Sequence, residues 1–387
     1  MRIIVALDAL DFNKVQASEC EWFKETGKEY KPNTPRVTPW IFSQILTGRQ
    51  DEKYRRSTPY KKPRVTDLEG HTIFHDCTDK GLKVFAYGFP LCANIKLPEG
   101  SLTTFDHFLG PRQNVPPVLK MARAGGNPEK DDKDNIFNAM VDETTAMFAN
   151  MRNFIRNNKF DVVFLYYQLF DACTHIYRPD DYISLMRLVE AEIKQTGKDL
   201  KAPIFYFSDH GSMEAKGYFH VNRWLKEKGY LDYEINEDYA KFHKAECVVL
   251  QSPFVKFNKE KSQFACFDAF DCMIDVLQSK NEDKLVRDLM DTGYFEKIIR
   301  QGNLVIPTLK EGYIASNNLI LGSKFEKMRN GWHSDHAIVG CTEFEPKAKN
   351  PCEVYEDLKK FCLKEEPKKE EKKEEDVNDD LAALGYL

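Results

Sequence analysis

Residues 2–10 read RIIVALDAL, an apolar and β-branched run that stops at Asp8. Short runs of this kind suit strands that are buried on both faces of a parallel sheet. The same character recurs in KVFAYGF (83–89), VVFLYY (162–167), PIFYF (203–207) and AIVGC (337–341). Helical patterns separate these runs, and such alternation is typical of a doubly wound α/β fold. The sequence therefore predicts a three-layer α/β/α core around a mostly parallel sheet.

Three segments between the predicted strands have the spacing of helices. Apolar residues recur at helical intervals over 135–158 and in YISLMRLVEAEI (182–193), which follows Pro179. A third helix is predicted over FHVNRWLKEKG (219–229), closed by Gly229 at the C′ position.

The predicted catalytic domain spans residues 1–363. Within it, segments of about 49–128 and 232–329 fit the sheet less well and are interpreted as cover over the strand ends, where selectivity usually resides. Residues 364–380 (KEEPKKEEKKEEDVNDD) form a charged linker with almost no apolar residues. The apolar LAALGYL (381–387) follows and is expected to dock on the core or on a neighbouring subunit, which leaves a homo-oligomer open.

Composition narrows the class of protein. The net charge of −5 gives no reason to expect a stable nucleic-acid partner. No stretch approaches the ~18 consecutive apolar residues of a membrane span, and the N-terminus lacks the apolar region of a signal peptide. The ten cysteines form no C-x-x-C pair, so neither a zinc ribbon nor a disulfide scaffold is indicated. These features predict a cytoplasmic protein with reduced thiols.

Polar residues that can bind metal follow the predicted strands or stand at helix starts. They are Asp8, Thr38, Asp171, His175, Asp209, His210 and His333. A doubly wound sheet brings such residues together at the carboxyl ends of its strands. Carboxylates and imidazoles favour zinc, manganese or similar divalent ions. Two such ions about 4 Å apart can stabilise both the attacking and the leaving oxygen of an in-line displacement.

Taken singly, most of these residues have a simpler structural explanation. Thr38 precedes Pro39 and makes a good helix N-cap, although a hydroxyl at a helix N-terminus also stands where a phosphoryl group binds. The D-x-x-x-H spacing of Asp171 and His175 is common by chance, and a lone histidine such as His333 is more often a structural residue. The S-D-H-G run that contains Asp209 is sharper, because an adjacent Asp and His at a strand end rarely serve packing.

The chain resembles the alkaline phosphatase superfamily, and within it the type I phosphodiesterase/nucleotide pyrophosphatase branch. The matching stretches span nearly the whole chain in the order of that family. They are IIVALDAL (3–10), RVTPWIFSQILTGR (36–49), GFPLCANIKLPEG (88–100), DACTH (171–175), FSDHGSM (207–213), FHVNRWLKEKGYL (219–231), IPTLKEGY (306–313), GWHSDHAIVG (331–340) and LAALGYL (381–387). The resemblance implies an alkaline-phosphatase-like core that hydrolyses small-molecule phosphate esters.

The resemblance also implies roles for the matching positions. Asp8, Thr38, Asp209 and His210 would surround one ion, with Thr38 also the nucleophile. Asp171, His175 and His333 would hold the other ion. The ions would be zinc, with manganese as the alternative, and the reaction would pass through a phosphothreonine intermediate.

Departures from the family pattern concern the substrate. Ile41 stands where nucleotide pyrophosphatases carry an asparagine that helps to bind phosphate, and Asp335 stands where a basic residue is usual. Three positions are candidates for contact with the substrate. Arg36 is a candidate phosphate contact, Ile41 is the residue at the position of that asparagine, and His336 is a candidate substrate contact or a polar residue at the mouth of a strand. This scarcity of positive charge favours phosphodiesters or phosphoanhydrides, with nucleotides among them.

Two alternatives stay open. One is a phosphomonoesterase or phosphotransferase on the same core. The other is a catalytically silent binding protein, against which the intact ligand set argues. A sulfatase is disfavoured because the region of Thr38 has no C/S-x-P-x-R motif.

Overall fold

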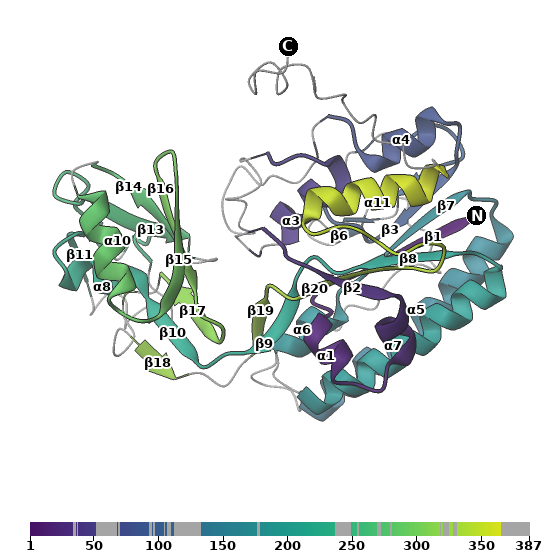
Figure 1. Cartoon of the computed structure of the whole chain (residues 1–387), viewed down its shortest axis with the longest axis horizontal. Helices are drawn as coiled ribbons and strands as arrows, with labels where there is room; N and C mark the ends of the chain where they lie inside the picture. Colours follow the sequence, from purple (N-terminus) through teal and green to yellow (C-terminus); the bar gives the residue numbers. More distant parts are fainter. Residues whose placement is uncertain are drawn as a thin grey trace, which may run out of the picture.

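The computed structural model describes residues 1–33, 36, 38–51, 68, 70–92, 95, 97–103, 105–106, 110–111, 133–175, 179–236, 249–253, 255–268, 272–278, 281–317, 319, 325–327 and 331–364. The larger of its two lobes is built on a seven-stranded sheet with the strand order β2-β20-β8-β1-β7-β3-β4 (Figure 1). In that order the strands span Gly27–Tyr30, Ala337–Cys341, Ile204–Phe207, Arg2–Leu7, Val162–Tyr167, Val84–Tyr87 and Leu102–Thr103.

The pairs from β8 to β4 are parallel, whereas β20 runs antiparallel to its neighbours β8 and β2. The predicted α/β class with a mostly parallel sheet is therefore confirmed. All five runs that the sequence predicts as strands form strands of this sheet. The edge strand β2 was not predicted, because its sequence GKEY is half exposed and carries no apolar run.

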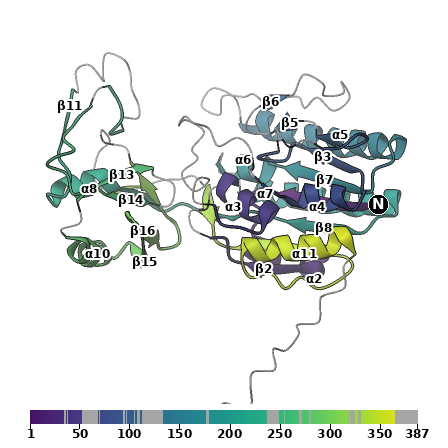
Figure 2. The same cartoon turned by 90° about the horizontal axis from the view of Figure 1, so that it is seen from above.

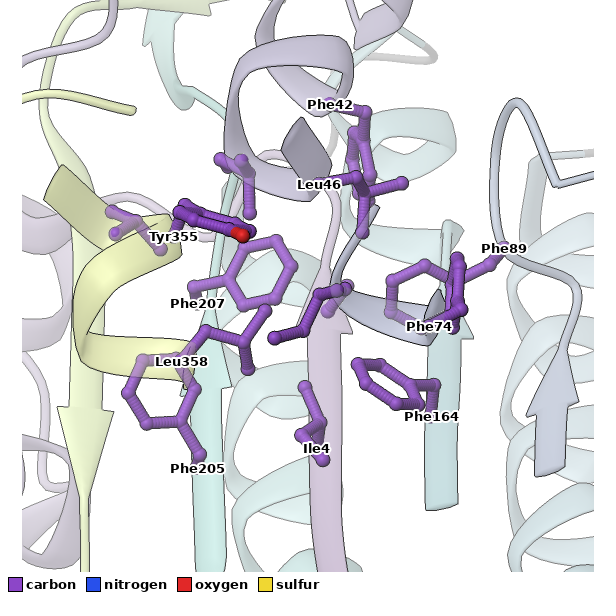
Figure 3. Close-up of a cluster of buried hydrophobic side chains, with 14 of the residues drawn as sticks. Ile4, Phe42, Leu46, Phe74, Phe89, Phe164, Phe205, Phe207, Tyr355 and Leu358 are labelled. Atoms are coloured by element: carbon purple, nitrogen blue, oxygen red, sulfur yellow. The ribbon is translucent and has the colours of Figure 1, made fainter. Parts of the chain in front are cut away.

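Alternating residues of the central strands point to opposite faces of the sheet. On one face Ile4, Phe164 and Phe207 pack under three helices: α3 (Thr38–Thr47), α4 (Ile73–Asp79) and α11 (Pro351–Leu363). Figure 3 shows this cluster. The ring centroids of Phe74 and Phe164 lie 4.8 Å apart. Each buried aromatic side chain contributes about 1.5–3 kcal/mol relative to an exposed one.

On the opposite face Ile3, Val163 and Tyr206 pack against the second layer of helices. Those helices are α1 (Phe12–Gln16), α2 (Glu21–Thr26), α5 (Lys133–Asn157), α6 (Leu169–His175) and α7 (Pro179–Leu200). Figure 1 shows the two helical layers on opposite sides of the sheet. The helices predicted over 135–158 and after Pro179 correspond to α5 and α7.

A smaller lobe lies beyond the carboxyl ends of the parallel strands (Figures 1 and 2). Its elements are β10 (Gly217–His220), α8 (Val221–Glu227), β11 (Tyr233–Ile235), β12 (Val255–Phe257), β13 (Phe264–Asp268), β14 (Met273–Val276), α10 (Glu282–Met290), β15 (Phe295–Gln301), β16 (Leu304–Leu309), β17 (Tyr313–Ser316) and β18 (Phe325–Lys327). The ladder of β9 (Gly211–Glu214) and β19 (Gly331–Ser334) lies where the chain passes between the lobes. The predicted role of 232–329 as a cover stays a prediction.

Some details differ from the predictions. Phe219 and His220 belong to β10, which pairs with β17 and β18, so α8 starts at Val221; Gly229 does adopt the left-handed conformation (φ +75°) expected after the helix. Within the first expected cover segment, α4 and β3 are parts of the core layers.

Other predictions fall on residues that the structure does not describe. These are most of the segment 49–128, the charged linker after Lys364, and the docking segment 381–387. The short strands β5 (Phe105–Asp106) and β6 (Gly110–Pro111) are the described remainder of that first segment beyond β4. None of the helices within the described ranges has the length and apolarity that a membrane crossing requires.

Candidate metal centre

The predicted ligands lie at the edge of the large sheet where its parallel strands end, or in the elements that begin there. They are Asp8 after β1, Thr38 at the start of α3, Asp171 and His175 on α6, Asp209 and His210 after β8, and His333 on β19. The structure brings all of them into one cluster, in two adjoining groups.

The first group is fully buried and centres on His210. Its Nε2 atom lies 3.4 Å from Asp8 Oδ1, 3.4 Å from Asp209 Oδ2 and 3.5 Å from Thr38 Oγ1. Ligand atoms of Asp8, Asp209 and His210 all lie within 4.8 Å of one another, as the atoms around a single ion do.

The second group is more open to solvent. Asp171 Oδ1 lies 3.2 Å from Nε2 of both His175 and His333, and these two nitrogens are 3.3 Å apart. The His175 side chain is 38% exposed, whereas those of Asp209 and His210 have no exposed surface. The rings of His210 and His333 stack with their centroids 3.8 Å apart, so the two groups are in direct contact.

The hydrogen bonds of the histidines leave lone pairs that face the carboxylates. His333 Nδ1 lies 2.8 Å from the carbonyl oxygen of Arg36, and His210 Nδ1 lies 3.1 Å from that of Gly211. A carbonyl oxygen only accepts, so each Nδ1 carries a proton, and each Nε2 is the ring nitrogen turned toward the cluster, where a metal-binding histidine presents its lone pair. Metal-binding histidines show this arrangement, in which the outer nitrogen is held by a protein acceptor.

The carboxylates in turn have oxygen atoms without a hydrogen bond. These are Asp8 Oδ1, Asp171 Oδ1 and both oxygens of Asp209. A buried acceptor that lacks a donor costs about 1–3 kcal/mol, and more when it is charged. Carboxylate oxygens and imidazole nitrogens that converge in this way suit divalent cations, so the residues present fit the predicted metal centre.

The pKa values show how crowded the charges are. Burial, together with the neighbouring carboxylates of Asp209 and Asp171, raises the pKa of Asp8 well above its ordinary value. Burial also lowers the pKa of His210 to about 4, which keeps this ring neutral and able to bind metal. Burial would raise the pKa of Asp171, but His175 and His333 outweigh it and hold that pKa well below the ordinary range.

Several neighbours that the sequence analysis did not single out hold the ligands in place. The Tyr166 hydroxyl donates to Asp8 Oδ2 and leaves Oδ1 for the cluster. Trp332 packs beside His175 and His333, with ring centroids 5.2 Å away in both cases. A tyrosine inside the apolar run VVFLYY was a usable signal, because a buried hydroxyl needs a partner.

Gly211 allows β9 to approach the loop after β1. A Cβ atom at this position would overlap Asp11 Oδ2 and Ser334 Oγ, and would lie 2.6 Å from the carbonyl oxygen of His336. The glycine of the S-D-H-G run is thus required for close packing directly behind His210.

Gly211→Ala is expected to displace β9 and to lower the free energy of unfolding by about 1–3 kcal/mol, as overpacking does. Because His210 is the preceding residue, metal content and hydrolysis should fall as well. Gly229→Ala is the control: its Cβ meets nothing within 4 Å, and its left-handed φ of +75° costs about 1–2 kcal/mol. Equal metal content in the two variants would contradict this role.

The candidate substrate contacts are placed differently. Arg36 adjoins the cluster through its carbonyl oxygen, which accepts from His333. Ile41 lies on the core-facing side of α3 and has no exposed surface, so its side chain is not accessible to a substrate. The His336 ring pairs with Glu29 at 2.6 Å and with Lys31 at 2.9 Å, at the edge of β2. These contacts match the second interpretation of His336, a polar residue at the mouth of the strand.

Comparisons with known proteins agree with this fold. The sequence model of the family "Type I phosphodiesterase / nucleotide pyrophosphatase" matches residues 40–336. No curated protein matches the sequence of the chain.

Two solved structures illustrate the likeness in fold. Phosphonoacetate hydrolase from Sinorhizobium meliloti, in complex with phosphonoformate, is 13% identical with a TM-score of 0.59, over 93% of this chain and 95% of that chain. An inactive form of murine ectonucleotide pyrophosphatase/phosphodiesterase 5, in complex with AMP, is 14% identical with a TM-score of 0.51, over 94% of each chain.

Proposed function

The chain belongs to the type I phosphodiesterase/nucleotide pyrophosphatase family of the alkaline phosphatase superfamily and is a phosphoester hydrolase, and we propose that it cleaves phosphodiesters or phosphoanhydrides through a phosphothreonine on Thr38. Two divalent ions, zinc or else manganese, serve as cofactors. The substrate is a small molecule, with nucleotides among the candidates.

One observation carries this proposal. His210 and His333 each hold a carbonyl oxygen with Nδ1 and turn Nε2 toward carboxylate oxygens that have no hydrogen-bond donor, and Thr38 Oγ1 lies 3.5 Å from His210 Nε2. Such a set of ligand atoms suits cations, and the hydroxyl lies beside them. Bound ions would lower the pKa of that hydroxyl and stabilise the leaving oxygen.

Asp8, Asp209 and His210 would hold one ion together with Thr38, and Asp171, His175 and His333 would hold the other. Thr38 is the first residue of α3, so the free N–H groups of that helix turn are available to the oxygens of a phosphoryl group.

The proposed reaction has two displacements. Thr38 Oγ1 forms a bond to phosphorus, the bond from phosphorus to the leaving oxygen breaks, and the leaving group takes up a proton. Water then attacks the phosphothreonine, the bond from phosphorus to Oγ1 breaks, and the hydroxyl of Thr38 regains its proton. With a diester the product is a monoester.

The nature of the second ester group decides the substrate class. Ile41 offers no polar atom, and the Asp335 carboxylate near His333 is half exposed and 3.9 Å from Lys31. A monoester has one more anionic oxygen than a diester and gains more from fixed positive charge. The proposal therefore includes a preference for diesters or phosphoanhydrides of at least about tenfold in kcat/KM, which is about 1.4 kcal/mol in the transition state.

The test compares p-nitrophenyl phosphate, bis-p-nitrophenyl phosphate and a dinucleotide on one metal-replete sample. A Thr38→Ala sample that is purified in parallel sets the background from contaminating phosphatases. Faster cleavage of the monoester would move the protein to the phosphomonoesterase alternative.

The proposal also includes a cytoplasmic location. The buried cysteines Cys20, Cys77 and Cys362 are free thiols, which agrees with a reducing compartment.

A further inference from the structure

Asp11 is a buried carboxylate outside the ligand set, three residues after Asp8. It is 2% exposed and forms the N-cap of α1, where its Oδ1 accepts from the amide of Lys14 at 2.9 Å. Its Oδ2 accepts from the amide of Ser212 at 3.1 Å and from the hydroxyl of Ser334 at 2.5 Å. A cap for a helix of five residues does not require these two additional partners.

The partners of Oδ2 stand next to the metal ligands. Ser212 follows His210 by two residues, and Ser334 directly follows His333. The two strands are also paired with each other, since His333 lies opposite Ser212 in the β9–β19 ladder. Asp11 therefore joins the loop that carries Asp8 to β9, which directly follows His210, and to β19, which carries His333.

The loop between Asp8 and Asp11 is itself held firmly. Ala9 has a left-handed φ of +63°, which is uncommon for a residue with a side chain. The Tyr182 hydroxyl donates to the carbonyl oxygen of Ala9 at 2.6 Å and accepts from the amide of Asp11 at 2.9 Å. Tyr182 of α7 thus holds this loop at Ala9 and at Asp11.

Lys14 offsets the charge of this carboxylate. Its Nζ atom donates to Ser212 Oγ at 2.7 Å and lies 4.2 Å from the centre of the Tyr182 ring. Ser212 therefore contacts both charged side chains: its amide donates to Asp11, and its hydroxyl oxygen accepts from Lys14.

We propose that Asp11 is a positioning residue that holds the ligands of both ions in mutual register. This inference rests on the proposed two-ion centre. A carboxylate is needed because both oxygens accept hydrogen bonds. An asparagine would have to turn its NH₂ group either toward the amide of Lys14 or toward the amide of Ser212, and in both cases two donors would face each other.

The experiment measures ion affinity separately from activity. Wild type, Asp11→Asn, Ser334→Ala and Asp357→Asn are loaded with zinc, and the ions bound per folded chain are counted by elemental analysis during titration with a chelator. Asp357→Asn is the matched control: this buried carboxylate on α11 accepts from the amides of Lys347 at 2.8 Å and Ala348 at 2.9 Å, and it touches neither ligand strand.

Asp11→Asn is expected to lower the affinity for both ions by about 10- to 100-fold, the range found when groups that orient metal ligands are removed. Ser334→Ala should lower mainly the affinity for the ion held with His333, because it removes only the hydrogen bond between β19 and Asp11. Asp357→Asn should keep both affinities, because Oδ2 alone accepts both amides and the asparagine carbonyl can replace it. This pattern separates positioning from a general effect of replacing a buried carboxylate.

The opposite outcomes overturn the inference. Wild-type affinities in Asp11→Asn, or an equal loss in Asp357→Asn, would show that Asp11 merely supports the fold. If Asp11→Asn does not fold, the test rests on Ser334→Ala. Unchanged affinities for both ions in that variant would refute the inference. Wild-type protein that binds no zinc would refute the two-ion centre itself, and the positioning role with it.

Discussion

Thr38→Ala is expected to lower the rate of phosphoester hydrolysis by several orders of magnitude, roughly 10³-fold or more, while the fold stays intact. The reason is that the proposed phosphothreonine cannot form once Oγ1 is gone. The loss of a helix-capping hydroxyl by itself costs only about 1 kcal/mol, far too little to unfold a domain of this size. The measurement is kcat/KM on a metal-replete sample with a phosphodiester substrate, together with a melting curve.

A second hydroxyl on the same helix supplies the control. Ser43 is 1% exposed, and its hydroxyl donates to the carbonyl oxygen of Trp40 at 2.7 Å. Ser43→Ala should lose a similar amount of stability and keep near-normal turnover. If Thr38→Ala also keeps near-normal turnover with metal bound, Thr38 is not the nucleophile.

Substitutions among the ligands form the second prediction with a large effect. Asp209→Ala or His210→Ala should remove the ion of the buried group, and His175→Ala the ion of the open group, with hydrolysis lost by roughly 10³-fold or more in each case. Elemental analysis after dialysis should then find one ion per chain in place of two.

The difference in exposure predicts an order of loss. His175 and Asp171 have side chains that are 38% and 16% exposed, whereas Asp209 and His210 are fully buried. A chelator should therefore take the ion of the open group first, in two separable phases. His71→Ala removes a histidine that lies 2.9 Å from Asp76 beside α4, outside the centre, and should keep both ions. Wild-type protein that retains a single ion, or none, under metal-replete conditions would refute the two-ion centre.

The sequence predicted the large sheet and the identity of the clustered residues. Runs such as IIVAL and VVFLYY are apolar or aromatic at every position, which is typical of a strand covered on both faces, and the cores that contain Ile4 and Ile3 on opposite faces show this covering. Because parallel strands end at one edge of a sheet, the residues that follow them had to meet there. The ordered motifs predicted the family, and the match over residues 40–336 confirms it.

The tertiary structure alone decided how the clustered residues are held. The edge strand β2 depends on pairing with β20, and its own sequence has no strand character. Ile41, which the sequence suggested as a substrate contact, is instead fully buried on the core-facing side of α3. The orientation of His333 is set by the carbonyl oxygen of Arg36, 297 positions earlier in the chain, and Asp11 meets Ser334 across 323 positions. Such contacts join backbone atoms and short polar side chains that no periodicity marks, so their partners exist only once distant segments have packed against one another.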